Sequence, residues 1–233
     1  MVKILNLNLW NYNEFERRKP NILRVIKKKN PDIITLQEIR DDITFNKKGD
    51  NQAMQLNKKL NYPYLEFYPV TDKQKERPEK YKDYCIEGTA VLSKFPIIKV
   101  EKYQLKKQDE DRYTCGNLYV RIKTEKPIDL VIVHFSNTDL FSLLHLLETL
   151  RWIKNKKIKT IILGDFNIRH PEWLYDIIEG EYLSSMKYKE YLSYPSANYT
   201  LDYILLPKGF NFKKFECLEE NISDHKALYA EIK

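Results

Sequence analysis

Apolar residues in this chain occur in short runs that end next to polar side chains. Residues 160–163 (Thr-Ile-Ile-Leu) are short, apolar and partly β-branched, which is typical of a strand buried on both faces. Residues 2–9 alternate and predict a first strand with Asn6 and Asn8 on one side. Residues 33–36 predict another buried strand, which leads directly into Gln37 and Glu38.

Further strands and helices alternate along the rest of the chain. Strand patterns cover residues 64–69, 86–94, 97–105, 113–123, 128–134, 201–206, 210–217 and 226–232, and helical patterns cover 22–29, 51–60, 140–153 and 171–178. The charged stretch 71–84 is expected to be a mobile surface loop. The alternation, with antiparallel pairs interspersed, predicts an α/β fold: a four-layer α/β/β/α sandwich of two packed mixed sheets flanked by helices.

The longest predicted helix has many leucines. We expect its core stripe to consist of Leu143, Leu144, Leu147 and Leu150.

Composition bounds the class of protein. The 233 residues, 42% of them hydrophobic, predict one domain over residues 1–233 with a sizeable core. A formal charge of +7 favours an anionic partner such as nucleic acid or a phosphorylated small molecule. Cys85, Cys115 and Cys217 are scattered and odd in number, so they indicate neither a metal-ligand pattern nor a disulfide framework. No secretory leader or membrane-spanning run is evident, so we expect a cytoplasmic protein without stable membrane association. The sequence gives no sign of obligate oligomerisation, so we expect a monomer.

Gly164-Asp165-Phe166-Asn167 carries the first chemical signal. It places a carboxylate and an amide just past a buried strand, where active-site groups concentrate in sheets covered by helices. The alternative interpretation is that Asp165 caps the helix that starts near Pro171. Comparable polar residues at other strand ends favour the first interpretation. They are Asn8, Glu38, Glu87, His134, Asp202, Asp224 and His225.

These residues belong to seven motifs. In chain order they are Asn8, Leu36-Gln37-Glu38, Gly88-Thr89-Ala90-Val91-Leu92-Ser93, Val133-His134-Phe135, Gly164-Asp165-Phe166-Asn167, Leu201-Asp202-Tyr203-Ile204 and Ser223-Asp224-His225. Their order over nearly the whole chain resembles the endonuclease/exonuclease/phosphatase superfamily. That superfamily consists of metal-dependent phosphoesterases and includes the pancreatic-type deoxyribonucleases.

The resemblance implies a metal cofactor. Hydrolysis of a phosphodiester needs charge neutralisation on the phosphate, an activated water and a stabilised leaving oxygen. Mg²⁺ prefers oxygen ligands and uses one or two protein carboxylates. The resemblance assigns Mg²⁺, which Mn²⁺ can replace, to Glu38, with Asn8 in support and Asp224 at a second or alternative position.

The resemblance also implies the catalytic residues. His225 matches the family's catalytic histidine, and Asp202 would fix its tautomer and favour its charged form. Asp165 would orient or deprotonate the attacking water. Asn167 would donate to phosphate oxygens in the transition state.

A second predicted pair is His134 with Glu87. In deoxyribonuclease-like members this histidine aids leaving-group protonation or phosphate binding, whereas a tyrosine stands there in abasic-site nucleases. The inositol-phosphatase branch carries Trp-Cys-Asp-Arg where this chain has residues 200–203 (Thr-Leu-Asp-Tyr). Both branches are therefore disfavoured.

The substrate is less constrained than the chemistry. Arg40 follows Glu38 as in the deoxyribonuclease motif, so we expect it to reach into a DNA minor groove. The alternative is that Arg40 forms a surface ion pair with a neighbouring acid. Arg112 is expected to hold a flanking phosphate. The leading hypothesis is an Mg²⁺-dependent DNA endonuclease of low sequence specificity. The alternatives are a phosphatase or phosphodiesterase acting on lipid head groups, nucleotides or other small phosphoesters, and a catalytically silent nucleic-acid-binding module.

Overall fold

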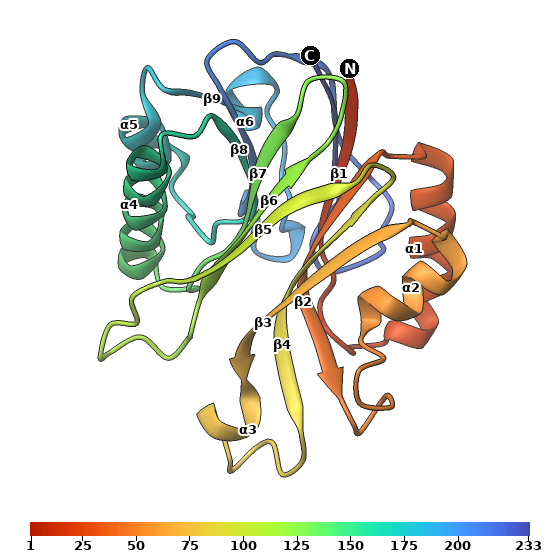
Figure 1. Cartoon of the computed structure of the whole chain (residues 1–233). Helices are drawn as coiled ribbons and strands as arrows, with labels where there is room; N and C mark the ends of the chain where they lie inside the picture. The colour runs from red at the N-terminus through yellow and green to blue at the C-terminus, as the bar shows by residue number, and fades with distance from the viewer.

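Two mixed β-sheets pack face to face at the centre of the molecule (Figure 1). The computed structural model describes residues 1–233. The first sheet has the order β11 (Phe212–Cys217), β12 (Leu228–Ile232), β1 (Val2–Asn8), β2 (Ile33–Asp42), β4 (Cys85–Ser93) and β3 (Tyr64–Asp72). The second has the order β5 (Ile97–Gln104), β6 (Gly116–Ile122), β7 (Ile128–His134), β8 (Thr160–Asp165), β10 (Asp202–Pro207) and β9 (Tyr182–Ser184).

Helices cover the outer face of each sheet (Figure 1). The first sheet is covered by α1 (Phe15–Lys29) and α2 (Gln52–Leu60), and the second by α4 (Asp139–Lys156) and α5 (Pro171–Ile178). Short helices α3 (Lys73–Glu76) and α6 (Ser185–Tyr188) and a 3₁₀ turn (Pro195–Ala197) lie in connections. One apolar core separates the sheets and two others lie beneath the helices. The predicted four-layer α/β/β/α sandwich is therefore confirmed. None of the helices has both the length and the apolar character needed to cross a lipid bilayer.

The sheet topology brings together the strand ends that carry the predicted site residues. β1 and β2 are parallel, and so are β7 and β8, so each pair ends at the same edge. This edge lies opposite the two chain termini (Figure 1). At Gly164, φ is +143° and an added Cβ would lie 2.0 Å from the carbonyl oxygen of Val133. Only glycine permits this approach, which positions the backbone just before Asp165.

The longest helix faces the core with only half of the predicted leucines: Leu143 and Leu150 are partly buried and pack against it. Leu144 and Leu147 of α4 are 38% and 45% exposed. The buried positions are Ser142, His145, Leu146, Thr149 and Ile153. Because leucines occur on several sides of this helix, their spacing does not determine which side meets the sheet.

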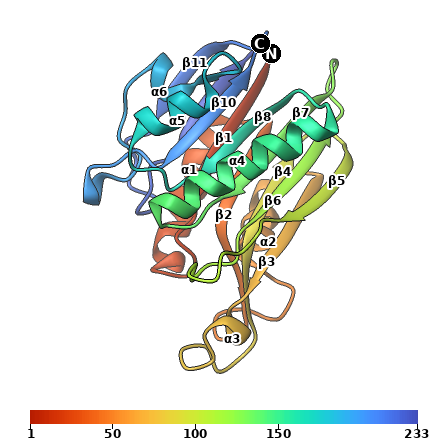
Figure 2. The same cartoon turned by 90° about the vertical axis from the view of Figure 1, so that its left-hand side faces the viewer.

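The charged stretch predicted to be a surface loop is partly regular structure. β3 continues to Asp72 and α3 follows directly, so Lys73 is buried. Together with the start of β4, this segment projects beyond the sandwich at the edge where the strand ends meet (Figure 2).

Candidate active site

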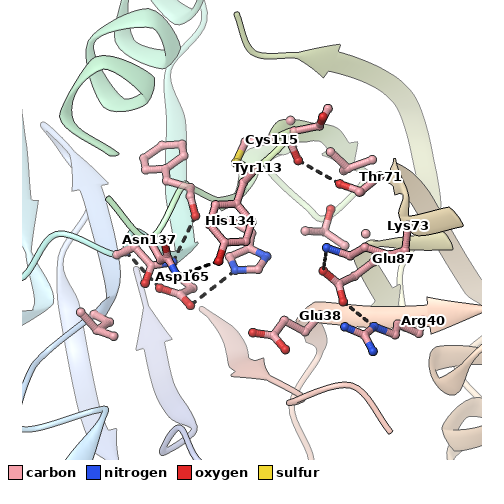
Figure 3. A pocket seen from close by; sticks show the side chains of 18 of the residues that line it. Glu38, Arg40, Thr71, Lys73, Glu87, Tyr113, Cys115, His134, Asn137 and Asp165 are labelled. Carbon is pink, nitrogen blue, oxygen red and sulfur yellow. Dashed lines mark hydrogen bonds and ion pairs between the residues drawn. The ribbon is translucent and has the colours of Figure 1, made fainter. Parts of the chain in front are cut away.

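A cleft of about 360 Å³ lies between the two sheets at this edge (Figure 3). It contains most of the predicted site residues, which come from both sheets and from five separate parts of the chain. They are Glu38, Arg40, Glu87, His134, Asp165, Asn167, Asp224 and His225.

Three predicted residues do not line the cleft. Asn8 and Asp202 lie behind it and hydrogen-bond to residues that do. Arg112 is exposed and lines a separate depression beside Glu110 and Leu140. The phosphate contact predicted for Arg112 therefore has no place within the main cleft.

His225 is held by two carboxylates. β8 and β10 are antiparallel, and their register makes Asp165 and Asp202 direct cross-strand partners. His225 Nδ1 lies 2.8 Å from Asp202 Oδ2, and its Nε2 lies 3.9 Å from Asp165 Oδ2. Burial by itself lowers the pKa of the imidazole, but the two carboxylates outweigh it and raise this pKa to about 10. His225 is therefore an imidazolium at neutral pH, with Nδ1 donating to Asp202.

Asp165 lies at the centre of the site and contacts most of its other polar residues. Its Oδ1 accepts the backbone N–H of Asn167 at 3.0 Å, and its Oδ2 accepts the Asn8 amide at 2.9 Å. His134 Nε2 lies 3.7 Å from the same Oδ2, so two imidazoles face one carboxylate oxygen. Burial raises the pKa of Asp165 to about 6, against the opposing effect of His225. A carboxylate with such a pKa exchanges protons readily near neutrality, as a general base must.

Asn167 has a geometry that suits its position in the turn. Its φ is +53°, a left-handed conformation that asparagine tolerates better than most residues. Its side-chain amide donates to the carbonyl oxygen of Phe135 at 3.1 Å, which leaves one N–H of the amide for a ligand.

Glu38 enters the cleft from an irregularity in β2. The register of β2 against β4 shifts between Leu36 and Ile39, and Glu38 has a φ of +53°. Asn8 Nδ2 donates to Glu38 Oε1 at 3.2 Å, and Asn11 Nδ2 donates to Oε2 at 3.0 Å. A bulge of this kind redirects a side chain away from the regular alternation, and bulges are frequent beside active sites.

Asn8 is oriented as a support for the two carboxylates. Its Oδ1 accepts the backbone N–H of Trp10 at 3.0 Å, while its Nδ2 points to Glu38 and Asp165. Because the amide faces both carboxylates with its Nδ2, this geometry favours the supporting role over direct ligation.

The carboxylates of Glu38 and Asp224 are suited to bind a divalent cation. Glu38 accepts hydrogen bonds from two amides and Asp224 from the hydroxyl of Ser223, all of which are neutral partners. Burial raises the pKa of Asp224, and the charge of Glu38 raises it further. A hard cation between the two would relieve this repulsion and find the oxygen ligands that Mg²⁺ prefers.

A second cluster, Asp165, Asp202 and His225, also has ligand atoms within 4.8 Å of one another. Within this cluster, His225 Nδ1 lies 2.8 Å from Asp202 Oδ2 and the two side chains hydrogen-bond to each other, which favours a hydrogen-bonding role.

Glu87 does not form the predicted pair with His134. Its Oε2 lies 2.5 Å from Arg40 Nε and its Oε1 lies 2.8 Å from Lys73 Nζ (Figure 3). Burial raises the pKa of Glu87, but Lys73 and Arg40 outweigh this effect and lower it to about 2. The pairing prediction was wrong because Arg40, a cross-strand partner, competes for the same carboxylate. For Arg40 itself, the ion-pair alternative is the one that the structure contains.

Sequence reasoning did not single out several cations that line the cleft. Lys73, Arg77 and Lys80 line it from the projecting segment, and Arg169 lines it from the opposite sheet. Arg169 donates to Asp139 Oδ1 at 2.7 Å and to the carbonyl oxygen of Asn137 at 2.8 Å. The lysines lay in a stretch so rich in charge that no single position stood out.

Comparison with known proteins places this geometry in context. No curated protein matches the sequence. Solved structures that share the fold include the human Nocturnin catalytic domain with a bound sulfate anion. It is 19% identical with a TM-score of 0.75, and the match covers 100% of this chain and 94% of that one. A mannosyl-6-phosphatase from Bacteroides thetaiotaomicron is 15% identical with a TM-score of 0.75, over 100% of both chains.

A third similar structure is D. rerio TDP2 complexed with a single-strand DNA product. It is 14% identical with a TM-score of 0.73, and the match covers 100% of this chain and 98% of that one. A mannosyl-6-phosphatase and a protein bound to a DNA product differ in what they act on, so these similarities carry the fold and not the substrate. The Endonuclease/Exonuclease/phosphatase family model matches residues 5–225. This chain therefore belongs to the Endonuclease/Exonuclease/phosphatase family, whose members are metal-dependent phosphoester hydrolases.

Proposed function

We propose that this chain is an Mg²⁺-dependent hydrolase that cleaves terminal or small phosphoesters. The observation that carries the proposal is the continuous set of contacts from Asp202 through His225, Asp165 and Asn8 to Glu38. It joins an imidazolium, a carboxylate near its pKa and an oxygen-ligand site within one cleft. These are the groups that phosphoester hydrolysis by water requires.

Each residue has a distinct task in this proposal. Asp165 orients the attacking water and accepts its proton. His225, held by Asp202, donates from Nε2 to a phosphate oxygen as negative charge builds up. Asn167 donates its free amide N–H to the same phosphate.

His134 completes the assignment on the leaving-group side. It faces Asp165 from the end of β7, where it can hydrogen-bond to the phosphate or to the departing oxygen. Glu38 and Asp224 would hold Mg²⁺, or Mn²⁺ in its place. The metal would neutralise phosphate charge and polarise the ester.

The shape of the cleft favours a terminal or small substrate. Thr71 Oγ1 donates to the carbonyl oxygen of Thr114 at 2.9 Å, and the N–H of Thr114 donates to Glu76 at 3.1 Å. These bonds join the projecting segment of the first sheet to the loop before β6 in the second. A polymer that continued through this side would meet the bridge. The ion pair of Arg40 and the position of Arg112 outside the main cleft also favour a small substrate over duplex DNA.

A DNA endonuclease of low sequence specificity is the competing proposal. The formal charge of +7 and the basic residues at the cleft support it, because phosphate backbones attract such surfaces. It requires DNA to enter beside the Thr71–Thr114 bridge.

One substrate panel tests both proposals. The protein is incubated with bis(p-nitrophenyl) phosphate, sugar and nucleoside monophosphates, and supercoiled plasmid, with Mg²⁺, Mn²⁺ or EDTA. We expect metal-dependent release of p-nitrophenol from the diester or of phosphate from the monophosphates, and both EDTA and His225→Ala should abolish it. His170→Ala is the matched control, because His170 is exposed and pairs with Glu172 away from the cleft. Efficient plasmid nicking without phosphate release would favour the endonuclease, and the absence of any turnover would refute both.

A further inference from the structure

The projecting segment forms one wall of the cleft. Lys73 of α3 and the following Arg77, Lys80 and Tyr81 all line the same cleft as His134 and His225. Figure 2 shows this segment extending past the sandwich beside the site. The wall thus faces whatever part of the substrate lies away from the reacting ester.

This wall carries more positive charge than its carboxylates neutralise. Arg40, Lys73, Arg77 and Lys80 line it, whereas Glu87 is its one carboxylate. Arg40 and Lys73 both bind Glu87 and their side chains are only 15% and 9% exposed. One carboxylate shared by two largely buried cations leaves a positive charge that is poorly solvated.

The two outer cations are free to meet a ligand. The partner of Arg77 is the exposed Glu79, at 3.6 Å, and Lys80 lies 5.4 Å from the ring centroid of Tyr81. Exposed pairs of this kind are weak, so a multivalent anion displaces them at little cost.

The remaining acid of α3 is directed elsewhere. Glu76 accepts the N–H of Thr114 at 3.1 Å and lies 3.9 Å from Lys107, and it does not line the cleft. It therefore fixes the wall in place and leaves the charge facing the cleft unchanged.

The cleft is consequently divided by charge. Glu38 and Asp224 form an acidic end suited to a cation, and the wall forms a basic end suited to an anion. The scissile phosphate belongs at the acidic end, where the catalytic histidines lie. A cationic wall beyond it has no task in hydrolysing a substrate with a single anionic group.

We propose that Arg77 and Lys80, with the charge of Lys73 behind them, bind a second phosphate of the substrate while the ester to be cleaved lies between Glu38 and His225. This inference rests on the proposed function and specifies its substrate class as phosphoesters that carry a further phosphate. Guanidinium and ammonium groups bind phosphate through charge-assisted hydrogen bonds, which are about twice as strong as neutral ones.

The test compares substrates that differ by one phosphate. We measure kcat/KM for adenosine 5′-monophosphate and adenosine 3′,5′-bisphosphate with wild type and with the double variant Arg77→Ala/Lys80→Ala. The matched control is Lys75→Ala/Lys82→Ala, which removes the same charge from the same segment. Lys75 is paired with Asp72 and Lys82 with the carbonyl oxygen of Pro78, and neither lines the cleft.

Wild type should prefer the bisphosphate. The cleft variant should lose about tenfold in kcat/KM for the bisphosphate and stay within about twofold for the monophosphate. The control should resemble wild type with both. Equal losses on both substrates, or equal losses in the cleft variant and the control, would overturn the proposal.

A second pair of substrates identifies the source of the phosphate. Thymidine 5′-monophosphate is compared with a 5′-phosphorylated thymidine dinucleotide in the same variants. Sensitivity of the dinucleotide as well as the adenosine bisphosphate indicates a neighbouring phosphate of a nucleic-acid end. Sensitivity confined to the adenosine bisphosphate indicates a small molecule, and both results support the subsite.

A binding measurement separates failure of the subsite from failure of the proposed function. If wild type turns over none of these compounds, the hydrolase proposal fails. The affinity for adenosine 3′,5′-bisphosphate is then measured by calorimetry in EDTA. An affinity about tenfold lower in Arg77→Ala/Lys80→Ala than in the control still supports the subsite, and an unchanged affinity refutes it.

Discussion

Replacing Glu87 by glutamine isolates the electrostatics of the buried ion cluster. The side chain of Glu87 is 12% exposed and lies between Arg40 and Lys73. Glutamine keeps the shape and removes the charge, so two largely buried cations lose their shared partner. Removing one partner of a buried ion pair is destabilising because the remaining charge stays desolvated.

The low pKa of Glu87 gives the size of the stabilisation that Glu87→Gln removes. This pKa is about 2 in the folded protein against 4.5 for the ordinary carboxyl group. Because the folded pKa is the lower one, the charge stabilises the fold above pH 4.5, and this stabilisation is lost as the pH falls towards 2. Linkage gives about 3 kcal/mol at pH 7 and about half of that at pH 3.

The assay is urea unfolding of wild type and Glu87→Gln at pH 7 and pH 3. We expect the difference in free energy of unfolding to be about 3 kcal/mol at pH 7 and to shrink by about half at pH 3. Glu101→Gln is the control, because Glu101 pairs with partly exposed Lys99 and Lys156 and should cost under about 1 kcal/mol. A Glu87→Gln penalty that is the same at both pH values would refute the reasoning.

Three further changes test the site and its support. Asp202→Asn should lower kcat by about 10³- to 10⁴-fold with little change in circular dichroism, because the imidazole loses the group that fixes its tautomer; a loss below about tenfold would contradict this. Glu38→Gln should weaken Mn²⁺ binding, measured by calorimetry, by about 100-fold, and unchanged affinity would exclude Glu38 as a ligand. Gly164→Ala should cost more than about 3 kcal/mol of unfolding free energy, because the new Cβ meets the Val133 carbonyl oxygen at 2.0 Å. Gly180→Ala, which meets nothing within 4 Å, should cost about 1 kcal/mol through its φ of +72° alone, and similar costs for both would refute the steric argument.

The layers of this fold were predictable from the sequence because strand signals are local. The apolar run at residues 160–163 and the alternation at 2–9 each specify a strand without reference to the rest of the chain. Parallel pairing within each sheet, together with the packing of the two sheets, then brings the polar residues beyond these strands to one edge. This is why Asn8 and Asp165 could be expected near each other and do form a hydrogen bond.

Pairings across strands were harder to predict, because they depend on register. The sequence could not show which of the cations in residues 73–80 face the cleft either. Burial distinguishes Lys73 from its neighbours, and this burial depends on how β3 pairs with β4. On α4, the inward positions include Ser142 and Thr149 because the helix packs against polar groups of the sheet. Thr149 accepts a hydrogen bond from Asn117, which no periodicity of leucines predicts.

The bulge in β2 links the two ends of the cleft. Leu36 pairs with Ala90 and Ile39 with Gly88, so Gln37 and Glu38 together oppose the single residue Thr89. A regular strand that continued from Leu36 would place Arg40 opposite Ile86, whereas the observed register places it opposite Glu87.

The same extra residue has a second effect. Leu36 and Ile39 both pack in the core beneath α1 and α2, and Gln37 bonds to Asn6 on the other face of the sheet. Regular alternation from Leu36 would turn Glu38 toward the helices, but the bulge turns it into the cleft. One irregularity therefore supplies the candidate metal ligand and also sets the register that joins Arg40 to Glu87 and Lys73. For this reason the acidic and basic ends of the cleft are parts of a single structural feature.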